Sequence, residues 1–545
     1  MSRTTNLQRL TLTISMLALV GSCGVTAFAQ AGAHFQATAA SLLRPDGQEA
    51  YYHTLPLTEQ EHEQMINNLL AMRQRIAAMK PSLALGPASP ASVPSAPETN
   101  AAELNSDLQT PVLAGDFVLG TNPKYTPVGD GRSSVAEPSI ANSGSHWFGT
   151  MNWNRAYSNN AGATWTVIAD DAGPADAPFF CCDQDAVHDH GRDVTIWSEL
   201  FLDANQITGP IRLHVRNSAN TADSCTYTLD GGTGILYDYP KIAMGNNYIY
   251  ITANQINNGV SWAGAVVWRY NLDQMAACQS VNGNVFTWTG SVGQVVWTPA
   301  RSTTDTMYLV TIENGSQNRY FWWPENSNSI FWNVVNVESS NFGQATCTGG
   351  RSGNNWMGDF LSTSSIGFQT RTTVAQDNGR QYLATYYTVN ANGTGRPQAY
   401  VAGTIVATDN ISSSGVLNFA DIFNGSACFG FADVASNARG DIGVVLGFGS
   451  SSTGGGAAQG YAAISDDYTR GTIRGYFQTV FLTAAADDNP SRYGDYLTAR
   501  TQEPADLAFI GTNYGLLSGG INVRFSEFLR GRYYTGWFNR HRLGI

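Results

Sequence analysis

The sequence predicts an all-β protein whose main body is a single seven-bladed β-propeller, preceded by a short helical segment and a Pro/Ala-rich linker. From about residue 115 onward, short aromatic and β-branched runs follow polar turns such as Asn378-Gly379. Seven runs of this kind, the first HWFGTMNW and the last DLAFIGTNY, begin roughly 40 to 70 residues apart. That spacing is typical of propeller blades, each a four-stranded sheet in which such a run forms the second strand. Six or eight blades are the alternatives.

The composition agrees with this fold and narrows the class of partner. Charged residues make up 13% of the 545 residues and 56 residues are glycine, which suits short strands joined by tight polar turns. The formal net charge is -12, and an acidic chain of this kind lacks the basic footprint of a nucleic-acid-binding protein. We therefore expect no nucleic-acid partner, and we expect the protein to be a monomer.

Residues 1–29 are expected to form a cleaved signal peptide. Arg3 and Arg9 precede an apolar stretch that is too short to span a bilayer, and residues 27–29 (AFA) fit the small-x-small cleavage rule. The alternative is lipid attachment at Cys23, because the tetrapeptide VGSC that ends there resembles a bacterial lipoprotein box. Either signal predicts a secreted or periplasmic protein. No later stretch is apolar enough to predict a transmembrane helix.

Residues 30–112 are expected to form a pro-segment or a spacer outside the propeller domain, 113–545. Apolar residues recur at helical spacing between Thr58, which can cap a helix, and Pro81, which ends it. The Ala/Pro/Ser-rich stretch that follows cannot build a core. The sequence therefore predicts one isolated helix and a linker before the first blade.

A propeller must join its first and last blades, and two segments are suited to this. Residues 113–122 precede the first blade, and residues 520–529 end the last one. We predict that they are neighbours in one sheet.

The cysteine count predicts three disulfides. Removal of Cys23 leaves an even number in an exported chain, with spacings that match no zinc site. We favour a bond between the adjacent Cys181 and Cys182, which would require a distorted turn because adjacent Cα atoms lie only about 3.8 Å apart. The alternative sends each of them to a distant partner. The favoured set is Cys181–Cys182, Cys225–Cys278 and Cys347–Cys428.

One short motif carries a resemblance to a known superfamily. The stretch YSNNAGATW contains Ser158, Asn160, Gly162 and Trp165 at the spacing of S-x-D-x-G-x-T-W, with Asn160 in place of aspartate. It resembles the Asp-box (BNR) motif of sialidase-type β-propellers. The resemblance implies the propeller fold, with the motif on an outer hairpin, and does not imply sialidase activity. The Arg-Ile-Pro-like stretch of sialidases is missing, and the nearest arginine to the first blade is Arg132.

The candidate site lies where the first strand of each blade lines the central channel. The segments before the aromatic runs place a carboxylate at comparable positions, so seven-fold geometry should bring several of them near one axis. Convergent carboxylates beside Arg and Tyr are what glycoside hydrolysis or uronide β-elimination requires. The alternatives are that these acids cap strand amides and bind channel water, or that they bind Ca²⁺. The predicted catalytic residues are Glu137, Asp183, Asp185, Asp433, Asp495 and Tyr493. The predicted substrate-binding residues are Arg132, Arg351, Arg492, Asp238 and Tyr239.

Two further sets of residues are interpreted as structural. His188 and His190 are expected to be turn residues in preference to metal ligands. The aromatic stretch 320–332 is expected to fill space between blades, although it could form a sugar-stacking platform.

The sequence as a whole predicts an exported, disulfide-stabilised propeller that acts on an extracellular polysaccharide or glycoconjugate. As an enzyme it would be a glycoside hydrolase or a polysaccharide lyase. The alternative is a non-catalytic propeller for glycan binding, adhesion or scaffolding. No cofactor is predicted beyond a Ca²⁺ ion as an option, and the identity of any other metal stays open.

Overall fold

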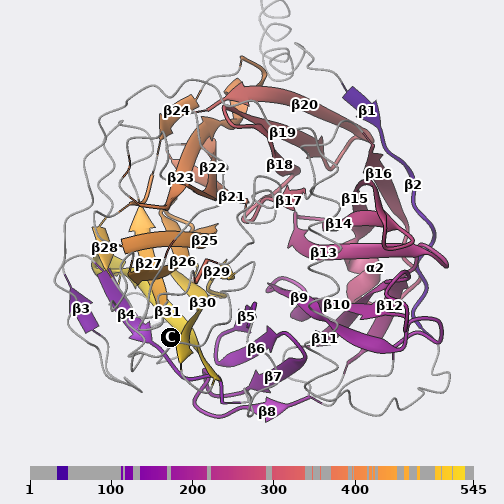
Figure 1. Cartoon of the computed structure of the whole chain (residues 1–545), viewed down its shortest axis with the longest axis horizontal. Coiled ribbons are helices and arrows are strands. Elements are labelled where there is room, and N and C mark those ends of the chain that lie inside the picture. Colours follow the sequence, from indigo (N-terminus) through magenta and orange to yellow (C-terminus); the bar gives the residue numbers. More distant parts are fainter. Residues whose placement is uncertain are drawn as a thin grey trace, which may run out of the picture.

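The chain folds into seven sheets arranged around one axis (Figure 1). This computed structural model describes residues 34–46, 112–114, 117–126, 136–168, 173–217, 223–289, 297–337, 347, 356–357, 370–377, 379–390, 396, 398–413, 416–419, 421–423, 427–450, 459–465, 476–478, 497–504, 506–517 and 520–533. The prediction of a seven-bladed β-propeller is confirmed. The predicted helix between Thr58 and Pro81 lies outside the described residues.

Each of the first three blades is an antiparallel sheet whose strands follow one another in the chain. Blade 1 comprises β5 (Ser139–Ser143), β6 (His146–Met151), β7 (Asn154–Ser158) and β8 (Thr166–Val167). Blade 2 comprises β9 (Phe179–Asp189), β10 (Val194–Leu202), β11 (Ile211–Asn217) and β12 (Cys225–Leu229). Blade 3 comprises β13 (Ile235–Met244), β14 (Tyr248–Asn257), β15 (Ser261–Asn271) and β16 (Gly283–Trp288), with the short helix α2 (Leu272–Ala276) between its last two strands.

Blades 4 to 6 repeat this order. Blade 4 comprises β17 (Thr298–Pro299), β18 (Thr306–Asn314), β19 (Gln317–Pro324) and β20 (Ser329–Asn336). Blade 5 comprises β21 (Arg371–Asp377), β22 (Arg380–Val389), β23 (Tyr400–Ala407) and β24 (Val416–Phe419), with the 3₁₀ helix η3 (Thr408–Ser413) before β24. Blade 6 comprises β25 (Ala427–Ser436), β26 (Ile442–Ser450), β27 (Gln459–Ser465) and β28 (Tyr476–Gln478).

Blade 7 closes the ring with strands from both ends of the propeller domain. It comprises β29 (Ala499–Thr501), β30 (Ala508–Leu517), β31 (Gly520–Arg530), β4 (Phe117–Thr121) and β3 (Val112–Ala114), and the 3₁₀ helix η4 (Gly531–Tyr533) follows β31. β31 pairs antiparallel with β4, with Glu527 opposite Thr121 and Phe528 opposite Leu119. The predicted pairing of 113–122 with 520–529 is therefore confirmed for β4.

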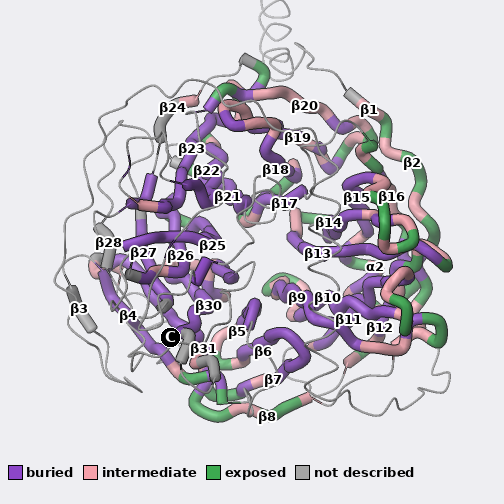
Figure 2. The backbone as a smooth tube through the Cα atoms, viewed as in Figure 1, coloured by how far each residue is buried: buried purple, intermediate pink, exposed green. Residues whose placement is uncertain are grey.

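The seven aromatic runs form the second strand of every blade, as predicted, because their β-branched and aromatic side chains pack against both neighbouring blades. Figure 2 shows that the strands nearest the axis are buried along almost their whole length. In the aromatic stretch 320–332, Tyr320, Phe321 and Trp323 are fully buried, while Trp322 stacks on Phe331 with ring centroids 5.8 Å apart. These contacts support packing as the role of this stretch.

The turn at residues 158–165 has the hydrogen bonds that its sequence predicts. Ser158 Oγ accepts a bond from the amide of Gly162 at 2.9 Å, and Asn160 Oδ1 accepts one from the amide of Thr164 at 2.8 Å. Gly162 has a φ of 80°, which favours glycine, and Trp165 packs edge-on against Tyr125 at 4.9 Å. An asparagine thus serves in this turn where the motif has aspartate.

Residues 34–46 lie along the outside of blades 4, 3 and 2, and we call this segment the strap. β1 (His34–Gln36) pairs with β20, and β2 (Thr38–Ala39) pairs with β16. Asp46 accepts hydrogen bonds from Thr226 at 2.9 Å and from Thr228 at 3.0 Å. This part of the segment 30–112 therefore belongs to the folded body, which the sequence did not predict. A domain boundary near residue 112 stays a prediction.

The strap offers a direct stability test, because its two leucines differ sharply in burial. Leu43 is 6% exposed and bridges to Val281, whereas Leu42 is 47% exposed. We expect Leu43→Ala to lower the free energy of unfolding by about 2 kcal/mol. Leu42→Ala should change it by less than about 0.5 kcal/mol. Urea denaturation of both variants measures this, and equal effects would mean that the strap contributes nothing to the fold.

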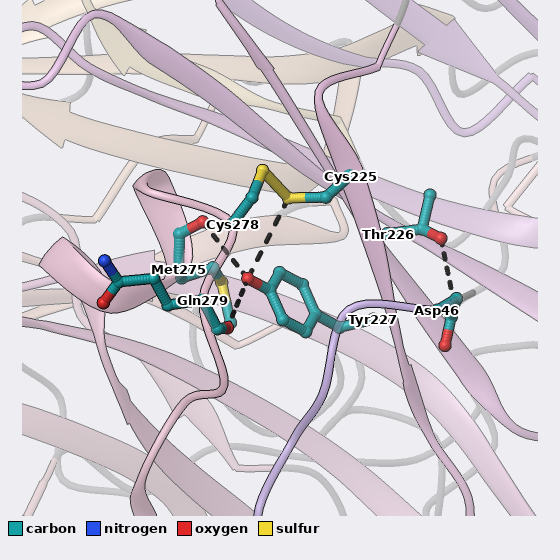
Figure 3. Close-up of a disulfide and its surroundings, with 7 residues drawn as sticks. All are labelled: Asp46, Cys225, Thr226, Tyr227, Met275, Cys278 and Gln279. Carbon is teal, nitrogen blue, oxygen red and sulfur yellow. Dashed lines mark hydrogen bonds between the residues drawn. A yellow bond between two sulfur atoms is a disulfide. The ribbon is translucent and has the colours of Figure 1, made fainter. Parts of the chain in front are cut away.

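The cysteines among the described residues form three disulfides, which match the favoured pairing: Cys181–Cys182, Cys225–Cys278 and Cys347–Cys428. The second joins β12 to the turn after α2 (Figure 3). There the Tyr227 hydroxyl donates to the carbonyl of Gln279 at 2.9 Å and lies 3.9 Å from Sγ of Cys225. This bond ties blade 2 to blade 3 beneath the strap. No helix among the residues that the structure describes is long and apolar enough to cross a membrane.

Candidate functional site

The first strand of each blade, which we call its inner strand, faces the axis. Each blade contributes one polar residue to a connected group, from its inner strand in six blades and from the segment directly after β17 in blade 4. We call this group the axial belt. Its members are Ser139, Asp185, Lys241, Arg301, Arg371, Asp433 and Arg500. The inner strands begin at one face of the propeller, called here the N-face, and end at the other, called here the C-face.

Asp185 joins blades 1, 2, 3 and 7. Its carboxylate accepts bonds from Ser139 Oγ at 3.0 Å, from the amide of Ile242 at 3.1 Å and from Arg500 Nη2 at 2.5 Å. Burial raises the pKa of Asp185, but the charges of Arg500 and Lys241 outweigh it and lower the pKa to about 2. Asp185 is therefore ionised at neutral pH and holds its cationic neighbours in place, so it is unsuited to donate a proton.

Asp433 likewise joins blades 4, 5, 6 and 7. It forms an ion pair with Arg301, lies 3.6 Å from Nε of Arg371 and accepts a bond from the amide of Ala499 at 2.7 Å. Burial and the neighbouring positive charge of Arg500 lower the pKa of Arg301 to about 10. Two guanidinium groups are thus held close together near the axis.

Lys241 is the titrating group of the belt. It is one of three lysines among the 30 basic residues of the chain, and it is 3% exposed. Burial lowers the pKa of Lys241 to about 7, while Asp185, Asp183 and Glu137 raise it and Arg371 lowers it further. An arginine here would stay charged, whereas this lysine exchanges its proton near neutral pH. Its Nζ lies 4.5 Å from the ring centroid of Tyr239.

A second layer of residues lies on the N-face side of the belt, two positions before the belt residue in four blades; three of these residues are on inner strands and Glu137 lies just before β5. These N-face residues are Glu137, Asp183, Tyr239 and Phe431. Three of them have positive φ angles: 45° at Glu137, 60° at Tyr239 and 59° at Phe431. Non-glycine residues rarely adopt this conformation, and such strain concentrates at functional sites.

The strain at these positions has a local cause. β13 and β25 carry a bulge here, between Asp238 and Lys241 and between Gly430 and Asp433, and bulges redirect side chains. Arg371 Nη2 donates to the Tyr239 hydroxyl at 2.7 Å, and Asn152 Nδ2 donates to Glu137 at 2.8 Å. The N-face residues are therefore held by specific partners as well as by the backbone.

The adjacent cysteines lie at a register shift in the pairing of β9 with β10, which corresponds to the bulges of β13 and β25. Cys181 pairs with Leu200 and Gln184 pairs with Glu199, so two residues are inserted between consecutive pairs. The Cys181–Cys182 bond spans this point with a Cα separation of 3.7 Å, and both cysteines are buried. The disulfide thus lies directly before Asp183. The sequence predicts that a disulfide between adjacent cysteines needs a distortion of the strand, and the break in the pairing of β9 with β10 at this point agrees with that prediction.

The structure brings some of the predicted site residues together and separates others. The charges of Glu137, Asp183 and Asp185 all raise the pKa of Lys241, and the ring of Tyr239 packs beside its amine. Asp433 pairs instead with Arg301 and Arg371, and Asp238 is buried on β13 next to Tyr239. The remaining predicted residues lie outside the described part of the chain, and their roles stay predictions: Arg132, Arg351, Arg492, Tyr493 and Asp495.

Four belt residues were missed from the sequence, and all are cationic: Lys241, Arg301, Arg371 and Arg500. Three of them lie in segments that the sequence identified as inner strands, so attention to basic residues there could have found them. Arg301 follows β17, which is only two residues long, and no periodicity marks so short a strand.

Of the two histidines, only His190 lies in a turn, because His188 is still part of β9. His188 lies on β9 with Nδ1 3.2 Å from the Thr195 hydroxyl, and His190 lies in the following turn. Within the described ranges, no group of three or more His, Cys, Asp or Glu side chains is arranged to hold a metal ion. Calcium binding stays a prediction for the chain as a whole.

Comparison with known proteins gives remote similarities to solved structures. No protein-family model matches the sequence, and no curated protein matches it. Among solved structures, an α-L-arabinanase from Penicillium chrysogenum in complex with arabinobiose is 10% identical, with a TM-score of 0.36 over 77% of this chain and 98% of that one. A GH93 α-L-arabinofuranosidase from Fusarium graminearum is 11% identical, with a TM-score of 0.37 over 72% of this chain and 92% of that one.

The NanB sialidase from Streptococcus pneumoniae is 12% identical to this chain, with a TM-score of 0.34 over 74% of this chain and 69% of that one. Similarity at this level carries no argument about activity. The assignment of the fold rests on the seven sheets themselves.

Proposed function

We propose that the protein is an exported carbohydrate-active enzyme that cleaves an extracellular glycan by acid–base chemistry on the N-face side of the axial belt. The observation that carries this proposal is the position of Lys241. Its pKa is near 7, it lies beside Tyr239, and the carboxylates of Glu137 and Asp183 act on it. A titrating group near neutral pH among charged and strained neighbours is typical of catalytic sites.

Uronide β-elimination is the reaction that suits these groups best. Neutral Lys241 would take the proton from the carbon next to the uronate carboxyl group, and the electron pair of that C–H bond would form a carbon–carbon double bond. The glycosidic C–O bond would break, and its oxygen would receive the proton of the Tyr239 hydroxyl. Arg371, which donates a hydrogen bond to that hydroxyl, would stabilise the resulting phenolate.

Glycoside hydrolysis is the second candidate, because Glu137 and Asp183 come from neighbouring blades and both act on Lys241. A screen over a panel of acidic and neutral polysaccharides separates the candidates. Elimination yields an unsaturated uronide with new ultraviolet absorbance, whereas hydrolysis yields reducing ends without that absorbance. Binding with neither product would identify the non-catalytic alternative.

Lys241→Arg tests the role of the titrating amine. The variant keeps the positive charge that its acidic neighbours require, but it cannot release a proton near neutral pH. We expect kcat/KM to fall at least about 100-fold. The wild-type rate should rise with pH through about 7, as Lys241 loses its proton, and the variant should lack this rise.

The matched control is Lys124→Arg, because Lys124 is an exposed lysine in the segment that follows β4. It should leave both the rate and its pH profile unchanged. A Lys241→Arg variant with wild-type rate and profile would exclude Lys241 as the proton acceptor.

A further inference from the structure

The channel opens at the C-face into a pocket with a volume of about 440 Å³. This volume lies within the range of small-ligand sites. The pocket is formed where inner strands end, so it lies on the opposite side of the belt from the N-face residues. Its polar lining includes Asn142, His188, Asp189, Arg301, Arg500 and Glu503.

Arg301 presents unused donors to this pocket. Its hydrogen bonds to the described residues all come from Nη1, which holds Asp433 and donates to the carbonyl of Ala499 at 2.5 Å. Nε and Nη2 donate none of these bonds and are not sealed from solvent. Since Arg500 also lines the pocket and its charge lowers the pKa of Arg301, an anion bound here would relieve repulsion between the two guanidinium groups.

Two buried polar atoms in the wall point to hydroxyl groups on the ligand. Asn142 Oδ1 and His188 Nε2 have no hydrogen-bond partner in the part of the chain that the structure describes. Asn142 uses its other atom, Nδ2, to donate to the carbonyl of Glu503 at 3.1 Å, which fixes the direction of its side chain. A buried acceptor left without a donor is costly, and a ligand hydroxyl would supply the donor.

We propose that the C-face pocket binds a hydroxylated carboxylate of the size of one or two sugar rings, such as a hexuronic acid. Its carboxylate pairs with Arg301 beside Arg500, and its hydroxyl groups bond with Asn142, His188 and Glu503. The site is separate from the chemistry assigned to Lys241 and does not depend on it.

Glu503 makes this binding dependent on pH. Burial, Asp506 and Asp189 raise the pKa of Glu503 to about 7. Below that pH the side chain is neutral and can donate to the ligand, whereas above it the carboxylate repels an anion. Binding should therefore weaken as pH rises through about 7. The other charged or titratable groups around Glu503 and the pocket are His188, His190, Arg192, Arg301 and Arg500.

Calorimetric titration of the full protein with glucuronate and galacturonate tests the proposal, with glucose and galactose as neutral matches and sulfate as a simple anion. The titrations are run well below and well above the pKa of Glu503. We expect the hexuronates to bind at least tenfold more tightly than the neutral sugars and than sulfate, and to lose at least tenfold in affinity at the higher pH. Equal binding of the neutral sugars, or of sulfate, would overturn the proposal.

Glu503→Gln keeps the shape of the side chain and removes its charge. It should bind hexuronate at both pH values, whereas Asp176→Asn, at an exposed carboxylate outside the pocket lining, should keep the wild-type loss at the higher pH. If Glu503→Gln still loses affinity at the higher pH, as the wild type and Asp176→Asn do, the role of Glu503 is overturned. Failure of this site is distinguishable from failure of the proposed activity, because calorimetry measures hexuronate binding whereas the polysaccharide screen measures glycan cleavage.

Discussion

Replacing Asp433 by Asn should lower the free energy of unfolding by about 3–5 kcal/mol, because it leaves the buried guanidinium group of Arg371 and the partly buried one of Arg301 without their carboxylate. Asp433 is fully buried and holds Arg301 from blade 4 and Arg371 from blade 5. A buried charge that loses its partner retains its desolvation cost without compensation. The variant should therefore unfold at a markedly lower urea concentration than the wild type.

The matched control is Asp409→Asn, which removes one carboxylate from an exposed ion pair. Arg380 and Asp409 lie 2.7 Å apart, but their side chains are 43% and 57% exposed. Exposed ion pairs contribute little to stability because water and salt screen them, so this substitution should barely shift the urea midpoint. Similar shifts for Asp433→Asn and Asp409→Asn would show that the belt does not stabilise the propeller.

Deleting residues 113–122 should abolish cooperative unfolding of the propeller. This deletion removes β4, whose residues Phe117, Val118 and Leu119 are buried against blade 7. Each buried apolar side chain contributes about 1.5–3 kcal/mol, and the lost pairing with β31 also exposes a sheet edge. A total loss of this size is comparable to the whole stability of a typical domain.

A deletion of equal length provides the control for shortening the chain. Removing residues 87–96 from the Ala/Pro/Ser-rich stretch should leave the melting transition unchanged, since that composition builds no core. Differential scanning calorimetry compares the two proteins. A sharp transition at the wild-type temperature after loss of 113–122 would mean that β4 does not close the ring.

The features that could be predicted from the sequence are those set by short-range patterns. The second strand of each blade is a short run rich in aromatic and β-branched residues, and such a run is recognisable wherever it packs. The turn around Asn160 depends on hydrogen bonds within a few residues, so its local sequence was sufficient. The closing pair followed from a further constraint, because a propeller must close. The even number of cysteines predicted three disulfides but left the partner of each cysteine open, and the favoured pairing is the one in the structure.

The candidate site could be predicted only in part, for a physical reason. Inner-strand positions of Glu137, Asp183 and Asp185 were identified, but Asp185 is bound to Arg500, which lies 315 positions further along the chain. No local pattern encodes such a pair. The burial that brings the pKa of Lys241 to about 7 likewise comes from several blades meeting at the axis.

The sequence by itself determined the all-β class and the strand of each blade that packs against its neighbours, because strand pairing and burial repeat along the chain, and it favoured seven blades over six or eight. Only the tertiary structure decided that the channel holds a cationic belt, that residues 34–46 strap the outer strands, and that a polar pocket opens at the C-face. These features join residues that are distant in sequence, and their energies depend on desolvation and on charges brought together by closure of the ring.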